Sequence, residues 1–153
     1  MLLKLKFIKN KKEVLNMQID SKVVNTKTEL LDIIKEGVNP LEYIKEEKDI
    51  DFICNSLVIT GNEEDTFFEE SAENLLRAIL YYLIYTENET KTIDRCKEIV
   101  KMGLDEETAR DSIKNLLKKE ERANMLYVAI DIASDKTFKA IFEKLNERLE
   151  NIN

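Results

Sequence analysis

The sequence contains no histidine and no tryptophan, and its 153 residues include only one proline and three glycines. Without histidine, neither a Ser-His-Asp triad nor a Cys-His nucleophile pair can be built. The glycines are isolated from one another, so the chain holds neither a Walker GxxxxGK(S/T) loop nor a GxGxxG turn. Because so few helix-breaking residues interrupt it, the chain suits long helices better than an all-β fold or a disordered chain.

Cysteine is also scarce: Cys54 and Cys96 both fall at apolar positions of predicted helices. Neither has a second cysteine at metal-ligand spacing, so we expect no zinc site and no cofactor. Two buried free thiols are typical of a reducing cytoplasm, although a disulfide between them is compatible with the sequence. The opening MLLKLKFIKNKK lacks the apolar core of a signal peptide, which also favours a cytoplasmic location.

Apolar helical periodicity, by contrast, is abundant, and it is densest between Phe67 and Thr86. Only Arg77 interrupts the apolar run from Leu75 to Tyr85. A helix that is apolar around most of its circumference is normally buried. This run is too short for a membrane span, which needs about 20 apolar residues. We therefore predict a mainly α fold, a compact multi-helix bundle around this central helix, in a chain of ordinary single-domain length.

Amphipathic segments flank the central helix on both sides. The inward positions predict helices around Leu30–Ile34, Leu41–Ile44, Phe52–Leu57, Ile93–Met102, Ala109–Leu117 and Phe138–Ile152, with a further apolar stretch from Met125 to Ala133. Residues suited to begin these helices are Thr26 or Thr28, Asn39 before Pro40, Asp49, and Asp65 or Thr66, and those suited to end them are Gly37, Gly61 and Gly103.

Two short strands are predicted near the N-terminus by period-two alternation, at Leu3–Phe7 and at Leu15–Ile19. Residues Asn10–Glu13 would turn them into a β-hairpin, which needs a partner surface to be stable. We therefore divide the chain into residues 1–38, with strands and a short helix, and residues 39–153, an all-helical domain.

Charge is distributed unevenly. Residues 1–27 hold seven lysines against Glu13 and Asp20, a net charge of +5, so the remainder of this chain of net charge −7 carries −12. A basic arm of this kind fits an acidic partner or a solvated strand face. Its candidate DNA contacts are Lys4, Lys6, Lys9, Lys11 and Lys12.

Acidic residues gather where the central helix begins: Glu63, Glu64, Asp65, Glu69 and Glu70. General acid or base chemistry would need one of them buried, and we expect solvated charges that favour the helix N-terminus instead. Tyr81, Tyr82 and Tyr85 lack interleaved basic residues, so they fit core packing better than a stacking platform for single-stranded nucleic acid.

From Asn39 onward the chain resembles a known family. The segments NPLEYIKEEKDIDFICNSLV and DTFFEESAENLLRAILYYLIY are similar to the all-helical domain of the TraG/TraD-like coupling proteins of type IV secretion and conjugation. The positions that carry the resemblance are Asn39, Pro40, Leu41, Tyr43, Ile44, Asp65, Phe67, Phe68 (where the family commonly has Trp), Ala72, Leu75, Leu76, Ala78, Tyr127, Ala133, Lys136, Thr137, Ile141, Arg148 and Leu149.

The resemblance implies recruitment. In that family the helical domain is inserted into a membrane-anchored hexameric ATPase and is implicated in choosing transfer substrates: a relaxase, its accessory proteins with attached DNA, or secreted effectors. Here the Walker motifs and the anchor are missing, so the resemblance implies a non-enzymatic module, with residues 1–38 as a remnant of the junction to the motor domain. The acidic residues around Asp65 are the expected contact face, and Asn39, Pro40, Tyr43, Phe68, Ala72, Lys136 and Thr137 are expected to be structural.

Two alternatives remain open. One is direct DNA binding through the basic arm, which would weaken steeply with salt. The other is a structural role, in which the chain joins a coupling-protein assembly through self-association or through the parent ATPase. We predict no membrane insertion by this chain in any of the three cases.

Overall fold

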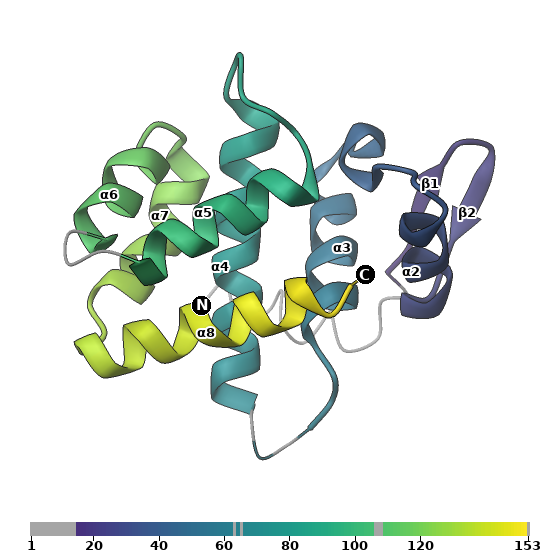
Figure 1. The fold of residues 1–153 in the computed structure, drawn as a ribbon. Coiled ribbons are helices and arrows are strands. Elements are labelled where there is room, and N and C mark those ends of the chain that lie inside the picture. The colour runs from purple at the N-terminus through teal and green to yellow at the C-terminus, as the bar shows by residue number, and fades with distance from the viewer. Residues whose placement is uncertain (1–14, 63, 65, 106–108, 153) are drawn as a thin grey trace, which may run out of the picture.

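The computed structural model describes residues 15–62, 64, 66–105 and 109–152, and it is a helical bundle built around α4, Thr66–Tyr85. Figure 1 shows α8 crossing α4, with α6 and α7 on one side and α3, α2 and a small hairpin on the other. The described elements are β1 (Met17–Ile19), β2 (Lys22–Val24), α2 (Lys27–Lys35), the 3-10 helix η1 (Pro40–Tyr43), α3 (Glu47–Val58), α4, α5 (Ile93–Asp105), α6 (Ala109–Leu117), α7 (Glu121–Asp131) and α8 (Asp135–Glu150). The predicted fold class is confirmed.

Helix α4 is central because nearly all of its sides are covered. It packs most extensively against α7, α8 and α3, and its residues Leu75, Leu76 and Leu83 are buried. One strip remains open: the positions Phe67, Glu70, Asn74 and Tyr85 are exposed at helical spacing. Phe67, the first residue of the stretch whose apolar pattern predicted a buried helix, is 59% exposed and lies outside the core, so the prediction was wrong at this position.

An N-terminal hairpin is present, but its second strand is not the one predicted. Strand β1 pairs antiparallel with β2, with Met17 opposite Val24. Asp20 adopts a φ of 59° in the turn between them, a conformation that Asp tolerates better than most residues. Strand β1 lies within the predicted strand Leu15–Ile19. The prediction missed β2, which begins only three residues after β1 ends. The predicted strand Leu3–Phe7 and turn Asn10–Glu13 lie outside the described residues.

The predicted helix starts are right at Thr26 and Asn39 and wrong at Asp49. The Thr26 hydroxyl accepts a hydrogen bond from the Glu29 N–H at 3.1 Å. Helix α3 begins two residues before Asp49, whose carboxylate reaches back to accept hydrogen bonds from the N–H groups of Lys45 and Glu46 at 2.9 and 3.1 Å. Asp49 therefore serves the helix start from inside the first turn, as the third residue of a capping box does.

Gly103 does not end its helix, contrary to the sequence prediction. Helix α5 continues through it to Asp105. A Cβ atom at this position would lie 2.2 Å from Cε2 of Phe142 on α8. Glycine is therefore placed here by close helix packing rather than by a helix stop.

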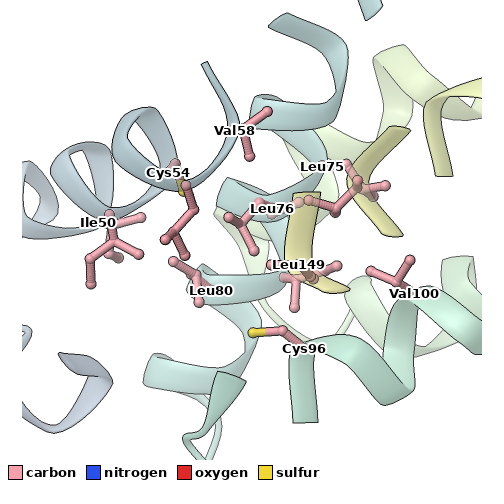
Figure 2. Close-up of a cluster of buried hydrophobic side chains, with 14 of the residues drawn as sticks. Ile50, Cys54, Val58, Leu75, Leu76, Leu80, Cys96, Val100 and Leu149 are labelled. Carbon is pink, nitrogen blue, oxygen red and sulfur yellow. The ribbon is translucent and has the colours of Figure 1, made fainter. Parts of the chain in front are cut away.

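Both cysteines point into one apolar cluster, which also holds Leu80 and Leu149 (Figure 2). Cys54 and Cys96 are buried free thiols, as predicted. Burial raises the pKa of both thiols well above the usual value, which keeps them protonated. Among the helices that the structure describes, none is both long and apolar enough to cross a membrane.

Candidate recognition surface

The acidic residues at the start of α4 divide into exposed and buried side chains. Glu64 and Glu70 are exposed, while Glu63 and Asp65 lie outside the described residues. Glu69 is only 2% exposed. The prediction that Glu69 belongs to a contact face is therefore wrong. The burial of Glu69 could have been predicted from its spacing. Glu69 precedes the buried Ala72 and Leu76 by three and seven residues, so all three lie on the same helix face.

Glu69 instead joins three helices from within. Its carboxylate accepts hydrogen bonds from the backbone N–H of Thr60 at 3.1 Å, from the Thr60 hydroxyl, and from a guanidinium N–H of Arg148 at 2.8 Å. Arg148 also donates from Nε to the carbonyl oxygen of Val58 at 2.9 Å. One ion pair thus ties α4, α8 and the end of α3 together.

The pKa of Glu69 reflects this setting. Burial alone would raise it, but the hydrogen bonds from Thr60 and Arg148 outweigh burial, and the pKa lies below the usual value. Glu69 is therefore ionised at neutral pH and is a structural anion rather than a proton donor.

An exposed aromatic side chain lies between the two exposed carboxylates in the sequence. Phe67 packs edge to face on the half-buried Phe68, with ring centroids 5.0 Å apart and planes at 82°. Phe68 is thus fixed against the core while Phe67 faces solvent. Phe67 with Glu64 and Glu70, which we call the α4 tip, combines an aromatic group with negative charge at one end of the central helix.

A charged cluster at the open strip of α4 explains the single interruption of its apolar run. Arg77 donates from Nε to Asp51 on α3 at 2.8 Å and lies 3.5 Å from the Glu73 carboxylate. Burial raises the pKa of Glu73, although Arg77 opposes the shift. The cluster joins α3 to α4, and its charges are directed at one another. Sequence reasoning did not assign Arg77 a partner.

The tyrosines have the predicted core role, with one exception. Tyr81 and Tyr82 are buried, and their hydroxyls donate to Glu47 and Glu89 at the edge of the core. Burial and the bond to Glu89 raise the pKa of Tyr82 to about 12. Tyr85 is 41% exposed, and the Arg122 guanidinium stacks 4.0 Å from the centre of its ring.

The positions that carry the family resemblance are mostly fixed inside the structure. Pro40 and Ala72 are buried, and Tyr43, Phe68 and Thr137 are half-buried. Lys136 and Phe67 are exposed, and Asp65 lies outside the described residues. The five lysines of the basic arm (Lys4, Lys6, Lys9, Lys11 and Lys12) lie outside the described residues.

The side chain of Asn39, one of these positions, forms two hydrogen bonds. Its Oδ1 accepts a hydrogen bond from the Leu41 N–H at 3.1 Å and so caps η1, while its Nδ2 donates to the carbonyl oxygen of Lys91 at 2.8 Å. The second bond ties η1 to the segment that precedes α5, 52 residues away in the sequence.

Replacing Asn39 by alanine is expected to lower the free energy of unfolding by about 1–2 kcal/mol, since it removes a cap and a long-range hydrogen bond. The matched control is Asn62→Ala. Asn62 accepts the same kind of bond, from the Glu64 N–H at 3.1 Å, but it is exposed. That change should cost less than about 0.5 kcal/mol. Urea unfolding followed by circular dichroism measures both, and equal losses would show that the bond to Lys91 contributes nothing.

The part of the chain that the structure describes contains no group of three or more acidic or cysteine side chains arranged to hold a metal ion. No protein-family model, curated protein or solved structure matches the chain.

Proposed function

We propose that this chain is a non-enzymatic protein-recognition module of the coupling-protein type, which works in the cytoplasm and recruits a protein destined for transfer. The observation that carries the proposal is the α4 tip, where Phe67 is 59% exposed and exposed carboxylates lie three residues before and after it in the sequence. Aromatic side chains are enriched at protein interfaces. The resemblance to the coupling-protein helical domain gives the class of partner: a relaxase, an accessory protein or a secreted effector.

The chemistry of the α4 tip favours a basic partner segment with an apolar anchor point. Carboxylates at the rim would speed encounter and reject acidic competitors more than they would raise affinity. Phe67 supplies the apolar contact, and its neighbour Phe68 holds it in place. The net charge of −12 on residues 28–153 also attracts a basic partner, over a longer range than the two carboxylates do.

The test is capture of partners from an extract of the source cells by the immobilised full chain, read by mass spectrometry. Glu64→Lys with Glu70→Lys should reduce capture of the specific partner at least tenfold, and Phe67→Ala should do the same without reversing charge. The control pair is Asp111→Lys with Glu143→Lys, which reverses two exposed carboxylates elsewhere. Equal capture by both pairs would refute the α4 tip as the contact face.

The alternative of direct DNA binding rests on the net charge of +5 on residues 1–27. Nuclease treatment of the extract separates the two functions, because a partner retained after nuclease is held by protein contacts. If capture is lost on nuclease treatment, falls steeply with salt and disappears on removal of residues 1–13, the function is DNA binding.

A further inference from the structure

Helix α7 presents apolar side chains to solvent as well as to the core. Met125 is 68% exposed, Val128 51% and Ile132, which directly follows the helix, 81%. Ala129 is exposed beside them. These four positions, which we call the α7 face, are spaced i, i+3, i+4 and i+7, so they form one stripe along the helix.

The α7 face is separate from the surface that holds α7 in the bundle. The inward side chains of Ala123, Tyr127 and Ile130 are buried, and α7 packs against α4 and α6 through that side. Single exposed apolar residues are ordinary, but a contiguous apolar stripe on a helix marks an interaction site.

We propose that the α7 face pairs with the α7 face of a second copy of this chain, with the two helices antiparallel. The order of large and small side chains along the α7 face supports pairing with a second copy. Pairing about the midpoint between Val128 and Ala129 places Met125 of each copy opposite Ile132 of the other, and Val128 opposite Ala129. The small Ala129 side chain gives room for Val128 of the other copy. The larger Met125 and Ile132 side chains then pack together at both ends of the contact between the two helices.

One exposed acidic and one exposed basic side chain lie near opposite ends of the α7 face. Glu121 lies four residues before Met125, in the first turn of α7. Lys136 lies four residues after Ile132, beyond the end of α7 and in the first turn of α8. Both are exposed, and neither forms an ion pair with another described residue. Antiparallel pairing brings Glu121 of each copy to the end where Lys136 of the other lies, whereas parallel pairing would bring like charges together.

The stripe is short, so the dimer is weak and depends on concentration. Sedimentation velocity of the full chain, from low micromolar to roughly 1 mM, should show a mass that rises toward that of two chains. Val128→Asp should keep the chain monomeric over this range. The matched control is Val23→Asp on β2, because Val23 is 53% exposed, nearly the same as Val128. The control should dimerise as the original chain does.

A charge swap tests the register. Glu121→Lys and Lys136→Glu should each weaken dimerisation about threefold to tenfold, because each places like charges at both ends of the seam. The double variant should restore the original dissociation constant.

Three results would overturn the proposal: a monomer at every concentration, equal behaviour of Val128→Asp and Val23→Asp, or a double swap no tighter than the single variants. A monomer would leave the α7 face to a different protein. None of these results bears on recruitment through the α4 tip, which these substitutions leave intact.

Discussion

Arg148→Ala is expected to lower the free energy of unfolding by about 3–5 kcal/mol, because it removes one partner of a buried ion pair. The side chains of Arg148 and Glu69 are only 14% and 3% exposed, and their closest N–O distance is 2.8 Å. Removing the guanidinium leaves the Glu69 carboxylate buried without its countercharge, and it also removes the bond to the Val58 carbonyl oxygen. Denaturant unfolding, followed by circular dichroism, measures the loss.

The control for this prediction lies one residue away on α4. Glu70→Gln removes an exposed carboxylate from the same helix turn and should change the free energy of unfolding by less than about 0.5 kcal/mol. Glu69→Gln removes the buried charge and should cost several times more than Glu70→Gln. If the two glutamine variants are equally stable, Glu69 is not held by Arg148.

The pH dependence of stability gives an independent signature of the same ion pair. The pKa of Glu69 is lower in the folded protein than its usual value, so the unfolded chain takes up the proton first as the pH falls. The stabilisation by Glu69 is therefore complete above the unfolded pKa, about 4.3, and is lost as the pH drops through the folded value. Glu69→Gln should flatten the acid limb of the stability profile, whereas Glu70→Gln should leave it unchanged.

The central helix and α8 were predictable because their burial follows directly from spacing. Phe138, Phe142 and Leu145 recur on one face of α8, and all three are buried. Helical periodicity encodes which face is covered, so the bundle follows from the pattern. The starts at Thr26 and Asn39 were predictable for a similar reason, since a side chain bonding a backbone group two or three residues away is a local interaction.

Some of the predictions that failed depend on residues distant in the sequence. Glu69 was assigned to solvent because it is charged and close to a helix start, but its countercharge lies 79 residues away on α8. No pattern in the sequence around Glu69 predicts that Arg148 is its partner. Likewise, the second bond of Asn39, to Lys91, depends on the tertiary fold. The local sequence pattern predicts which face of each helix is buried. Which side chains on different helices bond to one another is determined by how the helices pack.

The α7 face shows a different limit of the sequence pattern. The pattern identifies the apolar residues of α7 but not which of them are buried against other helices. The stretch Met125–Ala133 is apolar on two sides of the helix, and only one side meets α4. Tyr127 is buried while Val128, the next residue, is 51% exposed. A helix that is apolar on both sides has two surfaces to bury, and a single copy of the bundle covers one of them.

Gly103→Ala is expected to destabilise the protein by about 1–3 kcal/mol, although the same change in an ordinary helix interior stabilises by about 1 kcal/mol. The sign is decided by Phe142. A Cβ atom at position 103 would lie 2.2 and 2.3 Å from two carbons of its ring, closer than atoms can approach. The ring is fully buried and lies against Phe138, with centroids 4.6 Å apart, so it has little room to withdraw.

A double-mutant cycle separates this explanation from the helix stop that the sequence suggested. In a Phe142→Leu background the smaller side chain relieves the contact, so Gly103→Ala should cost much less than it does in the original chain, a coupling well above 0.5 kcal/mol. A glycine that ended a helix at positive φ would also resist alanine, but its cost would not depend on Phe142. Independent effects of the two substitutions would therefore mean that α5 and α8 do not meet at Gly103.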